Sequence, residues 1–150
     1  MTLDQTTTDA RRGLMGILAR ATRRELETAV ERFAPLPAIE DLRPVETGLV
    51  MLRGRIGGDG APFNLGEATV TRAAVRLNQR IGTSYILGRA PEQARAAAML
   101  DALWQDDAAR AVVEEAIAPV RERLLADRQA EQARTDRTRV EFFTLVRGDD

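Results

Sequence analysis

The side chains that could perform chemistry in this chain are few. Cysteine and histidine are both absent, which excludes thiol catalysis, disulfides and zinc–thiolate sites and removes the commonest general base. Carboxylates, arginine, a few Thr, Asn and Gln, one serine (Ser84) and one tyrosine (Tyr85) remain. Ser84 and Tyr85 have no histidine to activate them, so the sequence argues against nucleophilic catalysis. We therefore expect no catalytic residue on this chain.

Arginine is the most conspicuous functional group. All 22 basic residues are arginine, whose planar guanidinium binds phosphate and carboxylate through paired hydrogen bonds. Arginines gathered on a sheet could bind triphosphate or phosphonate oxygens, or pair with the carboxylates of a partner protein. We favour the partner, because arginine is enriched in protein interfaces. The candidate anion or partner contacts are Arg53, Arg55, Arg72, Arg76, Arg89 and Glu46.

Two other features could serve a ligand. Glu46 and Glu67 could bind magnesium or act as acid and base, but an ion pair with arginine or a solubilising place at a strand edge is the favoured interpretation. The glycine-rich loop 57–60 could hold an anion with its amides. A hairpin turn is favoured there, because no P-loop lysine is present. We assign no metal or cofactor to this chain.

Length and charge limit the class of protein. The chain has 150 residues, which suits one domain with an ordinary core. Its formal net charge of -1 gives no general attraction to nucleic acid or to an anionic membrane. No apolar run reaches the length of a membrane span, and the polar opening lacks the pattern of a signal peptide. We expect a cytoplasmic protein that binds neither nucleic acid nor a membrane.

Helices are predicted at the N-terminus. Asp9 is expected to cap the first helix, because apolar residues recur at helical spacing after it. Thr22 and Glu25 form a capping-box pattern, which predicts a second helix over Arg23–Phe33. Prolines then end this helix and begin an extended connector that reaches Pro44.

Strands are predicted in the middle of the chain. Residues 45–56 alternate with a period of two, which indicates a strand with one apolar face. The glycine-rich loop would reverse the chain, and Phe63–Glu67 would return. Residues 70–77 fit a helix or a strand. We interpret them as a strand, because their Thr and Val residues and the following segment Gly82–Leu87 favour an antiparallel pair.

Helices are predicted again after the strands. Pro91 suits the first position of a helix that runs to Trp104. Asp106 or Asp107 can cap the next helix, which Pro119 either kinks or replaces by another. We therefore predict an α+β fold in which an antiparallel sheet of about four strands is flanked by N-terminal and C-terminal helices.

The C-terminus combines a polar segment with an apolar end. Residues 126–139 contain no apolar side chain larger than alanine, which is typical of a solvated helical arm. Residues 140–146 follow and include Phe142 and Phe143, which form either a core strand or an interface anchor. We favour docking to a partner, because aromatic residues dominate interface energetics. The chain is divided accordingly into a domain, 1–125, and a C-terminal arm and docking segment, 126–150.

Ordered sequence blocks carry a family resemblance. They include Glu46-Thr47-Gly48-Leu49-Val50, the Gly57-Gly58-x-Gly60-x-x-Phe63 core, Ala68 to Leu77, Gly82-x-Ser84 with Gly88-Arg89, Asp101-Ala102-Leu103, Ile117-Ala118-Pro119 and Arg139 to Asp149. In this order and spacing, the chain resembles the G subunit (PhnG) family of the carbon-phosphorus lyase core complex, which acts in organophosphonate catabolism.

That resemblance implies a place in a larger enzyme. The family works with H, I and J subunits and an ATPase-type L component. Their synthase reaction displaces adenine from MgATP with an alkylphosphonate, giving a ribose 1-phosphonate 5-triphosphate such as the 1-methylphosphonate. An iron-sulfur cluster on the J subunit serves a later step. The expected role is therefore a supporting subunit of a transferase complex, with MgATP as a substrate of the complex.

Two other functions remain open from the residues themselves. The arginines and Glu46 could make a stand-alone enzyme or anion-binding protein. The chain could also be a generic homo-oligomeric scaffold unrelated to phosphonates. Turnover or tight binding of a phosphorylated ligand by the chain alone would favour the first of these.

Overall fold

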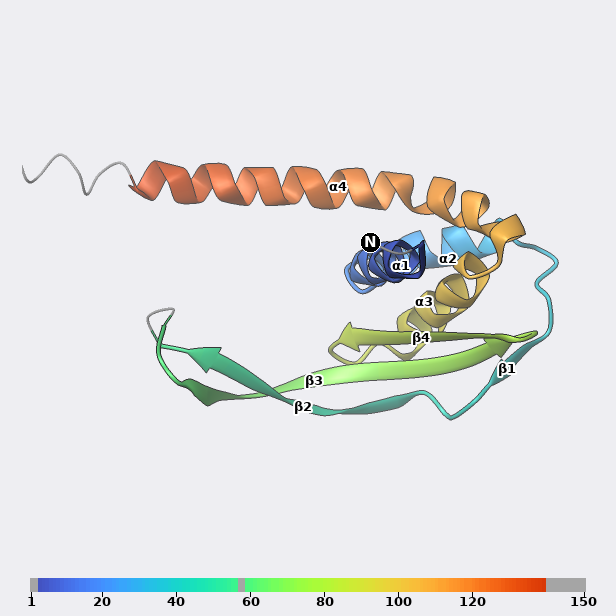
Figure 1. Ribbon diagram of the computed structural model, residues 1–150, viewed down its shortest axis with the longest axis horizontal. Coiled ribbons are helices and arrows are strands. Elements are labelled where there is room, and N and C mark those ends of the chain that lie inside the picture. The colour runs from blue at the N-terminus through green and yellow to red at the C-terminus, as the bar shows by residue number, and fades with distance from the viewer. Residues whose placement is uncertain (1–2, 57–58, 140–150) are drawn as a thin grey trace, which may run out of the picture.

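The sheet is built around one long strand. A computed structural model describes residues 3–56 and 59–139 of the chain (Figure 1). The elements in chain order are α1 (Leu3–Leu18), α2 (Arg23–Glu31), β1 (Ile39–Asp41), β2 (Glu46–Arg55), β3 (Pro62–Leu77), β4 (Arg80–Leu87), α3 (Pro91–Trp104) and α4 (Asp107–Arg139). The predicted α+β fold with a four-stranded antiparallel sheet is confirmed.

Strand β3 pairs with all three other strands. Strands β1 and β2 follow one another along one edge of β3, and β4 lies on the other edge. The strand interpretation of residues 70–77 is confirmed, but this segment and the predicted return strand form one strand of 16 residues. A bulge interrupts the β2–β3 register between Leu52 and Arg53. Strand β1 was not predicted; it has three residues and pairs only with the far end of β3.

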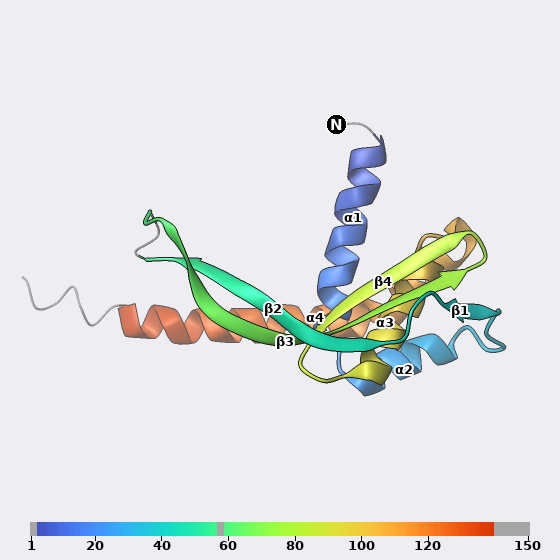
Figure 2. The ribbon, with the colours of Figure 1, turned by 90° about the horizontal axis from the view of Figure 1, so that it is seen from below.

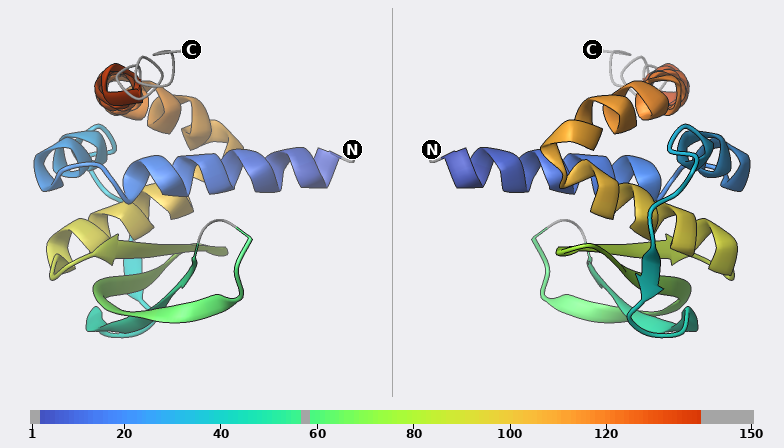
Figure 3. Two further views of the ribbon diagram at one scale, coloured as in Figure 1. Left: turned by 90° about the vertical axis from the view of Figure 1, so that its left-hand side faces the viewer. Right: turned by 90° about the vertical axis from the view of Figure 1, so that its right-hand side faces the viewer.

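The helices all lie on one side of the sheet, with α3 nearest to it (Figure 3). The predicted cap at Asp9 is wrong, because α1 begins at Leu3. Asp9 instead accepts a hydrogen bond from Arg12 at 3.0 Å within the helix. The capping box is confirmed: the Thr22 hydroxyl accepts from the Glu25 amide, and the Glu25 carboxylate accepts from the Thr22 amide. Helix α2 ends at Glu31, two residues before the predicted end.

The core lies between α3 and the part of the sheet where β3 and β4 pair. Alternate residues of β3 are buried here, while the residues between them point away from the helices. Helix α3 presents small buried side chains to β4. A Cβ on Gly82 would lie 1.9 Å from the Ala98 carbonyl oxygen and 2.6 Å from the Ala102 amide nitrogen. Glycine is required at this position because the strand and the helix backbones touch.

Helix α4 leaves this core as an arm. The helix continues through Pro119, and its residues 126–137 are exposed, as expected for a solvated helix. The arm and the β2–β3 hairpin extend toward the same side of the molecule (Figures 1 and 2). Phe142 and Phe143 lie outside the described residues. Their docking role and the proposed division of the chain at residue 126 stay predictions.

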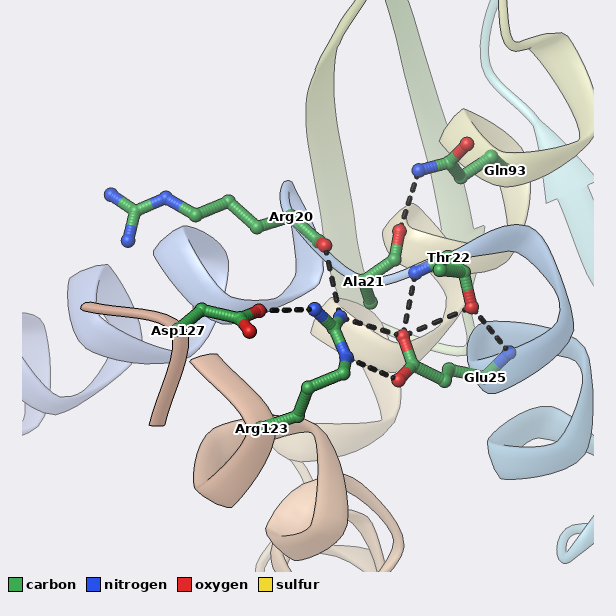
Figure 4. Close-up of polar contacts among 7 residues, drawn as sticks. All are labelled: Arg20, Ala21, Thr22, Glu25, Gln93, Arg123 and Asp127. Atoms are coloured by element: carbon green, nitrogen blue, oxygen red, sulfur yellow. Dashed lines mark hydrogen bonds and ion pairs between the residues drawn. The ribbon is translucent and has the colours of Figure 1, made fainter. Parts of the chain in front are cut away.

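Arg123 links α4 to the start of α2. The Arg123 Nε and Nη2 atoms donate to the Glu25 carboxylate at 2.9 and 3.0 Å, and Nη1 donates to Asp127 at 3.2 Å (Figure 4). The hydrogen bonds from Arg123, followed by those from Thr22, lower the pKa of Glu25 to about 2 against the desolvation by burial. The capping carboxylate of α2 therefore also attaches α4.

Candidate functional site

The arginines predicted on β3 lie on the face of the sheet turned away from the helices, here called the open face. The buried residues Thr71, Ala73 and Val75 alternate with Arg72 and Arg76, both of which are exposed. Period-two alternation therefore places the two arginines on one face, as predicted.

Arg72 is held by a carboxylate of its own chain. Glu46 of β2 lies opposite Arg72 in the strand register, and its Oε2 accepts from Arg72 Nη2 at 2.6 Å and from Nε at 2.9 Å. The Glu46 carboxylate is the main cause of a raised pKa of Arg72, with a smaller contribution from Tyr85. The favoured interpretation of Glu46 as an ion-pair partner of arginine agrees with this geometry.

Arg76 is also paired within the chain. Its Nη1 donates to Glu40 of β1 at 3.2 Å. A hollow of about 300 Å³ next to the Arg72–Glu46 pair is lined by Glu46, Thr47, Gly48, Leu49, Val50, Val70, Arg72 and Tyr85. An anion entering this hollow would compete with Glu46 for the guanidinium. The open face therefore contains neutralised ion pairs beside apolar side chains, which is closer to an interface than to an anion site.

The other predicted arginines lie elsewhere. Arg53 and Arg55 follow the bulge near the tip of the hairpin, and Arg55 Nη1 donates to the Gly60 carbonyl at 3.3 Å. Arg53 is seven residues along β2 from Glu46, or about 23 Å in an extended strand. The odd spacing also places it on the opposite face from Glu46. Arg89 follows the end of β4. The structure thus does not bring these arginines into one site.

The remaining candidate residues lie in the core or on the β2–β3 hairpin. The Ser84 hydroxyl is buried and donates to the Ala94 carbonyl of α3 at 2.6 Å. Glu67 lies opposite Met51 on the exposed part of the hairpin. The pairing of Arg55 with Pro62 confirms the predicted hairpin, although Gly57 and Gly58 lie outside the described residues. Within residues 3–56 and 59–139 no three acidic side chains gather as a metal site.

Comparison with known proteins identifies the family. Residues 9–148 match the family described as phosphonate metabolism protein PhnG. The chain belongs to the PhnG family. A curated family member, the alpha-D-ribose 1-methylphosphonate 5-triphosphate synthase subunit PhnG of Rhizobium meliloti (strain 1021), is 50% identical over 141 residues. The match covers 93% of this chain and 90% of that relative, so the resemblance found in the sequence is confirmed.

Two polar residues of this PhnG family member were missed by sequence reasoning. Asp101 is fully buried and accepts from Arg11 Nη2 at 2.7 Å, from Arg11 Nε at 2.8 Å and from the Thr83 amide at 2.9 Å. The bond to Asp101 is the main cause of a raised pKa of Arg11. The sequence held a sign that Asp101 is buried, because Asp101 falls on the helical stripe that continues Ala94, Ala97 and Ala98.

Thr71 is the second missed residue. It is fully buried; its hydroxyl donates to the Gly88 carbonyl at 2.6 Å and accepts from the Ala90 amide at 3.0 Å. It also contacts the Thr47 hydroxyl at 3.1 Å. These contacts join β2, β3 and the loop before α3. Both Asp101 and Thr71 support the sheet that carries the exposed arginines.

Large apolar side chains are exposed along β2, β3 and β4 of this PhnG family member. Period-two alternation predicted that one face of β2 would be apolar, yet both of its faces carry exposed apolar residues. The exposed apolar residues of the sheet and hairpin are Leu49, Val50, Met51, Leu52, Ile56, Phe63, Leu65, Ile81, Tyr85 and Leu87. So many exposed large apolar side chains on one sheet are typical of a protein interface. Across the described ranges no helix is both long and apolar enough to cross a bilayer.

Proposed function

We propose that this chain is a supporting subunit of an α-D-ribose 1-methylphosphonate 5-triphosphate synthase. The complex would transfer the ribose triphosphate moiety of MgATP to an alkylphosphonate and release adenine. The observation that carries the proposal is the 50% identity, over nearly the whole chain, to a relative named as a subunit of that synthase. The exposed apolar surface of the sheet is consistent with a protein that works in an assembly.

The chain contributes no catalytic group under this proposal. Glu46 is neutralised by Arg72, and the Ser84 hydroxyl is engaged with the Ala94 carbonyl. Both groups are already engaged by contacts within the chain, and the sequence offers neither histidine nor cysteine as a replacement. The role left for this chain is to shape or stabilise the subunits that bind MgATP and the phosphonate.

The partners are proposed from the family resemblance. They are the H, I and J subunits of the core complex, assisted by the ATPase-type L component. The resemblance also implies that the iron-sulfur cluster of the later step resides on the J subunit, and the absence of cysteine from this chain is consistent with that. The proposed location is the cytoplasm, where MgATP is available.

Reconstitution with purified subunits tests this function. The chain alone, given MgATP and methylphosphonate, should release no adenine, whereas the set containing its H and I partners and the L component should do so. Leaving this chain out of the full set should abolish or strongly reduce the release. Adenine release by the chain alone, or undiminished release without it, would contradict the proposal.

A further inference from the structure

The outer half of the β2–β3 hairpin has no cover in the described part of the chain. Strand β4 pairs with β3 only from Val70 onward, so residues 49–55 and 62–69 form a two-stranded ribbon, here called the ribbon arm. Figures 1 and 2 show it extending away from α2 and α3, toward the side to which α4 also extends. An isolated two-stranded ribbon is marginally stable in water. Contacts from outside the described ranges would therefore stabilise the ribbon arm.

Both faces of the ribbon arm are apolar. Leu49 and Met51 lie on the face directed to the helix side, with 63% and 61% of their surface exposed. Val50 and Leu52 lie on the other face, because side chains alternate along β2. Leu65 joins this second face, since its side chain lies against Gly54, and it is 61% exposed. A partner that covered only one face would leave the other in water.

The charges of the ribbon arm differ from those of the rest of the sheet. Arg72 and Arg76 are paired with Glu46 and Glu40. Arg53 and Arg55 form no ion pair with any carboxylate in the described ranges, and both lie on the face that carries Met51. Carboxylates at the rim of an apolar interface would pair with these two guanidinium groups.

We propose that the ribbon arm inserts into an apolar groove of a different subunit, with carboxylates of that subunit opposite Arg53 and Arg55. The inference rests on the proposed function, which supplies the assembly. A second copy of this chain fits less well, because a symmetric pair uses the same patch on both copies. Stacked ribbon arms would cover one face of each, and ribbon arms joined at their edges would cover neither. A groove encloses both faces.

Crosslinking from both faces tests the groove. A photoreactive benzoylphenylalanine is placed at Met51 or at Leu65 in the full chain, co-expressed with its H, I and J subunits. Leu36, which is 43% exposed in the connector before β1, is the matched control position. Positions 51 and 65 should both crosslink to the same partner subunit, well above position 36. Crosslinks to a second copy of this chain, crosslinks from one face only, or yields at the level of position 36 would overturn the inference.

Substitutions separate this inference from the proposed function. Met51→Asp, and Arg53→Glu combined with Arg55→Glu, should each reduce co-purification of the H, I and J subunits at least tenfold, while Leu36→Asp should not. The thermal midpoint of each isolated variant shows whether it still folds. Failure of the unmodified chain to co-purify with these subunits would contradict the proposed function. Normal co-purification of the ribbon-arm variants would contradict the groove alone.

Discussion

The two ends of strand β3 differ in how far their side chains are buried. From Thr71 to Leu77, alternate side chains are buried under α3 and polar groups are hydrogen-bonded. From Pro62 to Thr69, the same strand belongs to the ribbon arm, whose apolar side chains remain exposed. Both halves have residues suited to strands, so propensity does not distinguish them. The difference lies in what covers each half: one end of β3 contributes to the core, and the other leaves its apolar side chains exposed.

A glycine pair gives the largest contrast, here between the face of the sheet under α3 and the open face. Gly82→Ala should lower the free energy of unfolding by about 3 kcal/mol, because its Cβ would meet the Ala98 and Ala102 backbone with no room to shift. Gly48→Ala should change it by about 0.5 kcal/mol or less, since nothing lies within 4 Å of the added Cβ. Urea unfolding of the isolated chain measures both.

Two results would contradict the expected difference in stability between Gly82→Ala and Gly48→Ala. Equal midpoints for the two variants would mean that α3 does not press on β4 as closely as described. A large loss for Gly48→Ala would mean that the beginning of β2 is covered in the isolated chain. Either outcome removes the contrast between the face of the sheet under α3 and the open face.

The buried and the exposed ion pairs give the next contrast. Asp101→Asn should cost about 2 kcal/mol, because Asp101 is fully buried and accepts from both Arg11 and the Thr83 amide. Glu40→Gln removes the exposed pair with Arg76 and should cost about 0.5 kcal/mol or less. Thermal unfolding of the two variants compares them. Similar losses would show that the Arg11 contact is as well solvated as the surface pair.

Local signals allowed much of the fold to be predicted. The Thr22–Glu25 capping box and Pro91 at the start of α3 were recognised because their partners lie within a few residues. The strand interpretation of residues 70–77 held because the adjacent segment could pair with it across a short turn. These elements needed no information about distant parts of the chain.

Features that depend on pairing between distant parts of the sequence could not be predicted. Strand β1 has three residues and exists only because Ile39 meets Leu77 across the chain. The Arg72–Glu46 pair likewise depends on the β2–β3 register, so the sequence suggested an arginine partner for Glu46 but not which one. The exposure of both faces of β2 was also hidden, because periodicity indicates where apolar side chains point and not what covers them.

The junction between α2 and α4 predicts a pH dependence. The folded pKa of Glu25 is about 2, below its ordinary value of 4.5, so Glu25 stabilises the fold above about pH 4.5 and loses this contribution as the pH falls toward 2. Because the pair is partly exposed, the contribution should be about 1 kcal/mol. Glu25→Gln should therefore be less stable than the unmodified chain at pH 7, and the difference should shrink toward pH 3. A constant difference would contradict the assignment.

The smallest expected effect on stability comes from the open face. Replacing both Arg72 and Arg76 by alanine should change the free energy of unfolding of the isolated chain by about 0.5 kcal/mol per site or less, because both ion pairs are exposed. The same double variant is expected to weaken co-purification with the proposed H, I and J partners, but less than reversing the charges of Arg53 and Arg55. The reason is that Arg72 and Arg76 already have carboxylate partners, whereas Arg53 and Arg55 have none in the described ranges.

Steady-state kinetics of the assembled complex, beside the co-purification yield, would show which surface matters. A larger loss of assembly for the Arg53 and Arg55 variant than for the Arg72 and Arg76 variant would place the partner at the ribbon arm. Equal losses would extend the interface over the open face of the sheet as well. Normal assembly with a raised KM for ATP in the Arg72 and Arg76 variant would instead make the hollow beside Glu46 part of a substrate site.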